Sequence, residues 1–188
     1  MNTTSSHVLA RFEARAREVS AHVVHVHDEK AAAAHIAALV RGSPNATVFA
    51  PDGNDVWYTH LERALDGTGA RLHRGGLREH GGCTVGVTRA DWGIAETGTV
   101  VVNSANEEVR LASMLAETHV VILDATRVRP DLEALASDLG AMLNQSPGYT
   151  AFITGPSRTA DIESVLALGA HGPRAVHILL VGTEQQSS

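Results

Sequence analysis

Short runs of β-branched residues alternate with longer alanine- and leucine-rich segments along most of this chain, and this alternation constrains the fold more than any other feature. The strand-like runs occupy residues 46–50, 70–74, 84–88, 99–103, 119–125, 150–154 and 175–182. Segments with helical spacing of apolar residues occupy 28–42, 56–67, 106–117, 130–143 and 159–168. Strands that alternate with helices of these lengths predict an α/β domain with a mainly parallel sheet flanked by helices.

The first residues predict an amphipathic amino-terminal helix. Val8, Phe12 and Ala16 recur at helical spacing, so this helix should pack on the domain or on a partner. We expect residues 1–27 to form this helix and its lead-in, and residues 28–182 to form a single domain. The tail, 183–188, has the composition of a disordered segment.

Two of the predicted helices carry more detailed expectations. The helix over 130–143 should have Pro130 at its first position, because proline fits the first turn. The helix over 106–117 should place Leu111, Met114, Leu115 and, just beyond it, Thr118 on one face.

Composition argues against several classes of protein. The 188 residues include 15 Lys and Arg against 21 Asp and Glu, and 4% are aromatic, so we expect no nucleic-acid partner. The longest apolar runs fall far short of the roughly 20 residues of a membrane span, so we expect a cytoplasmic protein without membrane contact. Cys83 is the only cysteine, which rules out an intramolecular disulfide and an iron–sulfur cluster held by this chain alone.

The stretch GPSRTADIE (155–163) is the first candidate site. It follows a strand-like run and opens a predicted helix, where backbone N–H groups are unpaired and ligands of α/β proteins commonly bind. Ser157 or Thr159 can cap the helix, and Arg158 suits a carboxylate or a phosphate. Asp161 and its neighbours stabilise the helix start without any ligand, so a cap and an anion site stay open alternatives.

The loop GIAETGT (93–99) is the second candidate. If the runs 84–88 and 99–103 pair antiparallel, with 84–88 parallel to 150–154, this loop reaches the same rim as Ser157. Glu96 would then face Arg158 and could act as a general base, a general acid or a nucleophile. A solvated loop carboxylate is the alternative.

Other residues have weaker claims. His171 could carry a proton or cap a helix end, and Arg110 could be solvated or bind an anion. His25 and His27 could share a face of a strand, but no third ligand stands nearby, so we expect no metal site. The catalytic candidates are Glu96, His171 and Asp161, and the anion-binding candidates are Thr97, Gly98, Arg110, Gly155, Ser157, Arg158 and Thr159.

Three stretches together resemble a known family. GIAETGTVVV (93–102), RLASMLAETHVVILDATRV (110–128) and GPSRTADIESVLALGAHGPRAVHILLV (155–181) are similar to the LUD domain of the lactate utilization protein C family (LutC, also called YkgG). The likeness covers roughly half the chain, residues 89–181, and the first eighty residues match loosely. Ala116 departs from the proline expected in many relatives.

The resemblance implies a fold akin to the CoA-transferase, ribose-phosphate isomerase and glucosamine-phosphate isomerase group. It also implies a part in oxidising L-lactate to pyruvate beside partner proteins, at least one with iron–sulfur clusters, and no cofactor in this chain. Glu96 occupies a place weakly similar to the nucleophilic glutamate of CoA-transferases. A subunit that binds a small carboxylate or phosphate, a free-standing transferase or isomerase, a scaffold protein and a homo-oligomer all stay open.

Overall fold

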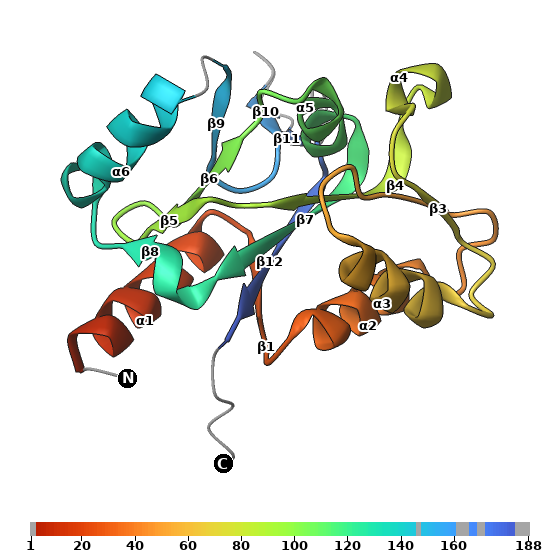
Figure 1. Ribbon diagram of the computed structural model, residues 1–188, viewed down its shortest axis with the longest axis horizontal. Coiled ribbons are helices and arrows are strands. Elements are labelled where there is room, and N and C mark those ends of the chain that lie inside the picture. Colours follow the sequence, from red (N-terminus) through yellow and green to blue (C-terminus); the bar gives the residue numbers. More distant parts are fainter. Residues whose placement is uncertain (1–2, 146–147, 161–165, 169–171, 183–188) are drawn as a thin grey trace.

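A parallel six-stranded sheet forms the centre of the fold (Figure 1). The computed structural model describes residues 3–145, 148–160, 166–168 and 172–182. The main sheet has the order β1-β12-β7-β4-β2-β3, and every neighbouring pair in it is parallel. Its strands are β1 (His22–Val26), β2 (Thr47–Phe49), β3 (Arg71–His73), β4 (Cys83–Arg89), β7 (Ala116–Asp124) and β12 (Ala175–Val181). The predicted α/β fold with a mainly parallel sheet is confirmed.

A second, mixed sheet lies beside the main one. It has the order β8-β5-β6-β9, and its strands are β5 (Trp92–Ile94), β6 (Thr99–Asn103), β8 (Val128–Arg129) and β9 (Thr150–Ile153). The predicted antiparallel pairing of 84–88 with 99–103 is wrong, because 84–88 belongs to β4 in the main sheet. β6 instead pairs antiparallel with β5 and β9. The chain leaves the main sheet after β4, and the short β5 starts the second sheet.

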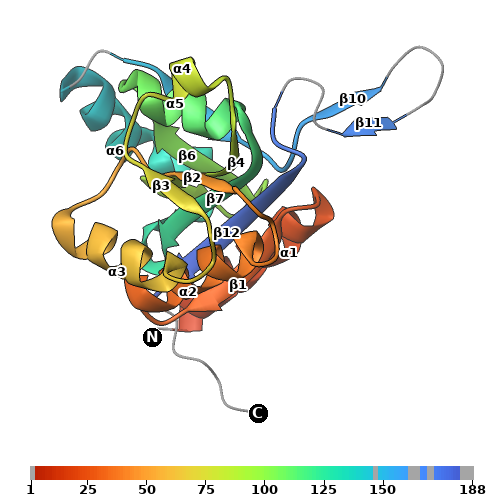
Figure 2. The same cartoon turned by 90° about the vertical axis from the view of Figure 1, so that its right-hand side faces the viewer.

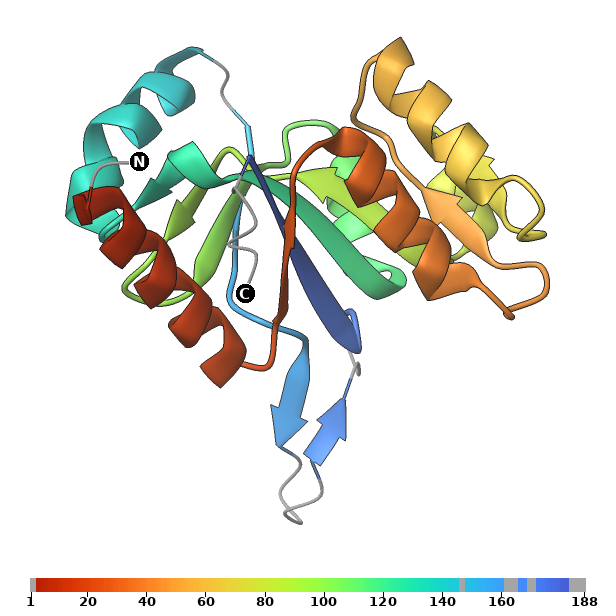
Figure 3. The ribbon, with the colours of Figure 1, turned by 90° about the horizontal axis from the view of Figure 1, so that it is seen from below.

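Helices cover both faces of the main sheet (Figure 3). They are α1 (Thr3–Glu18), α2 (Glu29–Val40), α3 (Asp55–Leu65), α4 (Leu77–His80), α5 (Glu107–Met114), α6 (Leu132–Gln145) and the 3-10 turn η1 (Ala125–Arg127). α2 and α3 pack on one face, and α1 and the second sheet pack on the other. Side-chain caps fix two helix starts, because Asp28 accepts the Ala31 N–H at 2.7 Å and Asn54 accepts the Trp57 N–H at 2.9 Å.

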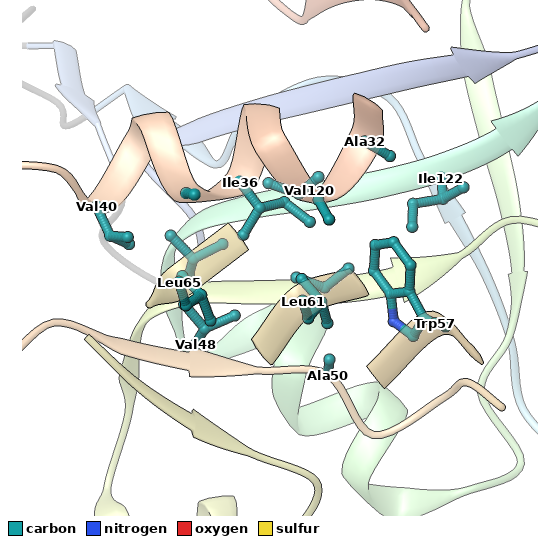
Figure 4. Packing of buried hydrophobic residues seen from close by; sticks show 14 of the residues in the cluster. Ala32, Ile36, Val40, Val48, Ala50, Trp57, Leu61, Leu65, Val120 and Ile122 are labelled. Atoms are coloured by element: carbon teal, nitrogen blue, oxygen red, sulfur yellow. The ribbon is translucent and has the colours of Figure 1, made fainter. Parts of the chain in front are cut away.

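The apolar residues of β7 show why the sheet is covered on both sides. Val120 and Ile122 pack under α2 and α3, whereas Val121 and Leu123 face α1 and the second sheet. Figure 4 shows the first of these two cores, in which side chains of α2 and α3 meet side chains of the strands. The continuous apolar run predicted for this strand therefore reflects burial on both faces.

Two predicted helices end or begin elsewhere. α5 ends at Met114, and Thr118 lies in β7, so the predicted shared face of this helix is wrong. Met114 is 54% exposed and Leu115 41% exposed, because the chain turns into β7 at this point. α6 begins after Pro130, and the Asp131 side chain accepts the Ala134 N–H at 2.8 Å as its cap.

The helix predicted over 159–168 is wrong where the structure describes it. Residues 158–160 form β10 (Arg158–Ala160) and residues 166–168 form β11 (Leu166–Leu168), which pair antiparallel. This hairpin projects from the body of the protein (Figure 2).

No helix in the described part of the chain is both long enough and apolar enough to cross a membrane.

Gly140→Ala is expected to stabilise the protein by about 0.5–1 kcal/mol. Gly140 lies inside α6, and a β-carbon placed there would have no heavy atom within 4 Å, so alanine restricts the unfolded chain without a clash. Urea unfolding monitored by circular dichroism measures the change. A variant that is less stable than the parent would contradict the open space around Gly140.

Candidate functional site

The two predicted loops do converge, although for a different reason from the one predicted. β6 and β9 are antiparallel, so the start of β6 lies beside the end of β9, with Val100 opposite Ile153. The hydroxyl oxygens of Thr97 and Thr99 are 2.7 Å apart, and those of Thr99 and Thr154 are 2.8 Å apart. A chain of three hydroxyl groups therefore joins the loop after β5 to the end of β9.

Helix α1 closes over both loops at their glycines. Gly98 and Gly155 have positive φ angles of 67° and 79°, which favour glycine. A β-carbon at Gly98 would lie 2.3 Å from the Ala16 nitrogen, and one at Gly155 would lie 2.2 Å from the Val19 carbonyl oxygen. These two glycines of the motifs thus let the carboxyl end of α1 and the residues after it approach the loops, which is a structural role.

Glu96 lies on this rim with its side chain exposed to solvent. Its backbone N–H donates to the Pro130 carbonyl at 2.9 Å, which ties the loop to the start of α6. Glu96 thus lies on the rim as an exposed loop carboxylate, as in the solvated alternative.

Ser157 connects the rim to the lead-in of β12. Its N–H donates to the Pro173 carbonyl at 3.0 Å, and a β-carbon at Gly172 would lie 3.1 Å from the Ser157 β-carbon. Arg158 and Thr159 begin β10, so the predicted helix start that would bind an anion there is wrong. The side chains of Arg158 and Thr159, and all of Asp161 and His171, lie outside the described residues.

Arg110 does not join this rim. Its guanidinium donates to the Ser104 carbonyl at 2.6 Å and lies 4.7 Å from the centre of the Tyr149 ring. Ser104 follows the carboxyl end of β6, whereas Glu96 precedes its amino end. Arg110 therefore fastens α5 to the segment before β9, at the opposite end of the strand.

A cleft of about 410 Å³ lies at the carboxyl edge of the main sheet. Its lining residues come from the ends of β2, β4, β7 and β12, from the start of α2 and from η1: Glu29, Asp52, Arg89, Ala90, Asp91, Ile122, Asp124, Arg127 and Val181. β2 leads outward to β3, whereas β4 leads the other way to β7, so the strand order reverses here. Ligands of open α/β sheets bind at this kind of edge, where the strand order reverses.

Arg89 lies at one wall of this cleft in an ion pair. Its guanidinium is 2.6 Å from Glu29, and both side chains are about one-third exposed, at 32% and 30%. The same guanidinium lies 5.3 Å from the centre of the Trp57 ring, which is buried beside Ile122 (Figure 4). Packing against the ring and pairing with Glu29 hold Arg89 in place at the cleft.

Asp91 is the partly buried acid of the cleft. Its Oδ2 accepts the Asn103 N–H at 2.7 Å, and its backbone carbonyl accepts a bond from Arg127 at 3.4 Å. Burial raises the pKa of Asp91 above its usual range, and the charge of Asp52 raises it further, against the lowering effect of the Asn103 bond and of Arg127. A partly buried carboxyl group with a raised pKa in a cleft is a candidate for proton transfer.

The residues of this cleft were not predicted from the sequence as a site. The available signal was a charged residue directly after each predicted strand: Asp52 after 46–50, Arg89 and Asp91 after 84–88, and Asp124 near the end of 119–125. Carboxyl ends of parallel strands share one edge, so these positions could have been grouped together.

The two histidines considered as metal ligands, His25 and His27, each lie beside a carboxylate. His25 lies 2.8 Å from Glu13 of α1, and His27 lies 3.2 Å from Asp28. Among the residues that the structure describes, no group of three or more His, Cys, Asp or Glu side chains could hold a metal ion.

Curated relatives cover part of the chain. The uncharacterized protein YkgG of Escherichia coli K12 is 38% identical over 100 residues, and lactate utilization protein C is 37% identical in Halalkalibacterium halodurans and 36% identical in Geobacillus sp. WCH70. These matches cover 51% to 52% of this chain and only 42% to 44% of the relatives. The chain therefore spans less than half the length of these relatives in alignment.

A solved structure extends the likeness of the fold to nearly the whole chain. The crystal structure of a DUF162 family protein from Deinococcus radiodurans superposes with a TM-score of 0.68 at 17% identity, covering 95% of this chain and 98% of that one. The sequence profile of the family described as LUD domain matches residues 9–181. The match includes α1 from Leu9 onward, both sheets and the cleft. The chain belongs to the LUD domain family.

Proposed function

We propose that this chain acts in lactate utilization and binds a small hydroxycarboxylate, such as L-lactate, in the cleft at the carboxyl edge of the main sheet. The names of the relatives from Halalkalibacterium and Geobacillus support the pathway. The single observation that supports the site is the meeting of two guanidinium groups and a partly buried carboxyl group in one cleft, those of Arg89, Arg127 and Asp91.

Each of these three groups has a distinct task in the proposal. Guanidinium groups bind carboxylates through paired hydrogen bonds, so Arg89 and Arg127 hold the ligand carboxylate. Asp91 has one oxygen fixed by the Asn103 N–H, and its other oxygen can exchange a proton with the ligand hydroxyl. When the ligand binds, the Arg89 guanidinium either releases Glu29 or bonds to both carboxylates, that of Glu29 and that of the ligand.

Oxidation of L-lactate to pyruvate releases two electrons and two protons, and the electrons need an acceptor. The thiol of Cys83 is buried, and burial raises its pKa to about 12, so it stays protonated and unreactive. We propose that iron–sulfur proteins of the same pathway accept the electrons while this chain binds the acid. Purification of the tagged chain from lactate-grown cells tests this, and the absence of any iron–sulfur protein from the complex would contradict it.

Arg127→Gln and Arg89→Gln are each expected to weaken the binding of L-lactate and pyruvate by about tenfold or more, because each removes a charge-assisted hydrogen bond. Amide resonances of the labelled protein, titrated at fixed ionic strength, report the affinity. Arg63→Gln is the matched control, since Arg63 is an exposed arginine in the last turn of α3 and does not line the cleft. Equal loss of affinity in all three variants would show that only net charge matters.

The rim around Glu96 is the alternative binding site, supported by the hydroxyl contacts that join its loop to Thr154. Glu96→Gln separates the two sites, because it leaves the cleft residues in place. If Glu96→Gln weakens lactate binding and Arg127→Gln does not, the ligand binds at the rim. Turnover of an acyl-CoA or a sugar phosphate by the isolated chain would instead support a free-standing transferase or isomerase that uses Glu96.

A further inference from the structure

The charges around the cleft bear on which anion it can hold. We propose that the cleft accepts a hydroxy acid with a single negative charge and discriminates against the phosphorylated form of the same acid, with Asp52 and Asp124 as the residues that set this selectivity. The inference rests on the proposed function, because it takes the cleft as the ligand site.

Carboxyl groups outnumber guanidinium groups in the cleft. The lining includes two arginines, Arg89 and Arg127, and four acids, Glu29, Asp52, Asp91 and Asp124. Glu29 already balances Arg89 at 2.6 Å. The guanidinium groups of Arg89 and Arg127 can bond one carboxylate, whereas a phosphate ester would bring further negative charge beside the exposed Asp52 and Asp124.

The helix starts near the cleft are also unsuited to a phosphate. Phosphate sites of α/β proteins commonly use free backbone N–H groups at a helix amino terminus. At α2 the Asp28 side chain accepts the Ala31 N–H, and Glu29 adds a second acid in the first turn. At α3 the Asn54 side chain accepts the Trp57 N–H, and Asp55 follows it. Side chains thus occupy donors that a phosphate would need, and Glu29 and Asp55 place negative charge in the same first turns.

A hydroxy acid matches the acceptors that remain. Asp124 lines the cleft and uses Oδ1 to accept the Thr126 N–H at 2.8 Å and the Thr126 hydroxyl at 2.7 Å, and its Oδ2 has no hydrogen-bond partner among the residues that the structure describes. Asp52 is exposed at the same cleft. Carboxylate oxygens accept hydrogen bonds from ligand hydroxyl groups, so these acids favour a hydroxylated ligand while they repel a second anionic group. A volume of about 410 Å³ also lies within the usual range of ligand pockets.

Glycerate and 3-phosphoglycerate test the proposal, because they differ only by a phosphoryl group on the distal hydroxyl. We expect glycerate to bind the full chain about tenfold more tightly or better at low ionic strength, with a smaller difference at high salt. Asp52→Asn, alone and with Asp124→Asn, should raise the affinity for 3-phosphoglycerate relative to that for glycerate by about threefold per substitution, because the phosphorylated ligand carries more negative charge. Asparagine at position 124 keeps Oδ1 as the acceptor for Thr126.

Asp66→Asn is the matched control, because this substitution removes the same charge from an exposed acid at the far end of α3. Tighter binding of 3-phosphoglycerate than of glycerate, with no effect of Asp52→Asn, would overturn the inference while the cleft remains the ligand site. If neither glycerate, 3-phosphoglycerate nor L-lactate shifts the resonances of Arg89, Asp91 and Arg127, both this inference and the proposed function fail. An equal gain of affinity in Asp66→Asn would also overturn the selectivity assigned to Asp52.

Discussion

Gly98→Ala is expected to destabilise the protein by about 2–5 kcal/mol. The new β-carbon would overlap the backbone of α1 at Ala16, and backbone cannot rotate out of the way as a side chain can. α1 must therefore shift, which exposes the buried side chains of Leu9 and Phe12. Gly155→Ala should act in the same way through the Val19 carbonyl. Urea unfolding followed by circular dichroism measures both losses.

Gly42→Ala separates the clash from the cost of the backbone conformation. Gly42 also has a positive φ, 81°, but a β-carbon there would have no heavy atom within 4 Å. We expect this variant to lose only about 1 kcal/mol. If Gly98→Ala is no less stable than Gly42→Ala, α1 does not rest on the loop as described.

Acid is expected to weaken the fold from pH 6.5 downward, and His119 should account for a large part of the loss. His119 is fully buried in the main sheet, with Nε2 2.9 Å from the Thr88 hydroxyl, and burial lowers its pKa to about 4. A lowered pKa means that the unfolded chain binds the proton first, so stability is complete above pH 6.5 and falls as the pH approaches 4. The loss from this residue is on the order of 3 kcal/mol.

A second group of histidines should act in the same direction. His177 of β12 stacks on His22 at 4.6 Å and lies 3.2 Å from His35 of α2, and burial with these two neighbours lowers its pKa to about 4. Burial, followed by the charge of His22, also lowers the pKa of His35. Protonation of this cluster would place like charges together at the edge of the sheet.

His119→Gln tests the acid prediction through the slope of the free energy of unfolding with pH. Any destabilisation caused by the substitution itself does not enter this comparison. Glutamine does not titrate, so the free energy of unfolding should fall less steeply between pH 6.5 and 5 in the variant than in the parent, by up to about 1.4 kcal/mol per pH unit. The carboxyl groups and the other histidines are the same in both proteins, so their contributions to the slope cancel in the comparison. Parallel slopes in the two proteins would exclude His119 as the source of acid sensitivity.

The central strands β7 and β12 of the main sheet were predictable because they carry strong local signals. β7 and β12 are continuous apolar runs, and burial on both faces produces that pattern in any parallel sheet. The second sheet was not predictable, because β5 has only three residues and gives no period. The helix predicted over 159–168 is wrong at its described residues because 158–160 pair with 166–168 as antiparallel strands, and local propensity is a weak guide against such pairing.

The candidate site was also predictable only in part. We predicted that the loop of Glu96 reaches the same rim as Ser157. The structure joins this loop to Thr154, three residues before Ser157, but through the pairing of β6 with β9 and not through the predicted pairing of β4. The cleft was missed because its charged residues are single positions, each at the end of a different strand. Nothing local marks Arg89 or Asp91 as neighbours of Asp124, and only the order of strands in the main sheet brings them together.

The placement of β1 has a consequence for how this protein acquires its structure. β1 forms main-sheet pairs with β12 alone, so His22 has to find His177 across most of the sequence. During synthesis the first strand therefore leaves the ribosome long before its partner does, and it has to wait without its backbone bonds. Contacts of such high sequence separation slow folding, and the unpaired strand remains exposed and prone to aggregation until its partner is synthesised. We expect nascent chains halted before Ala175 to remain incompletely folded and dependent on chaperones.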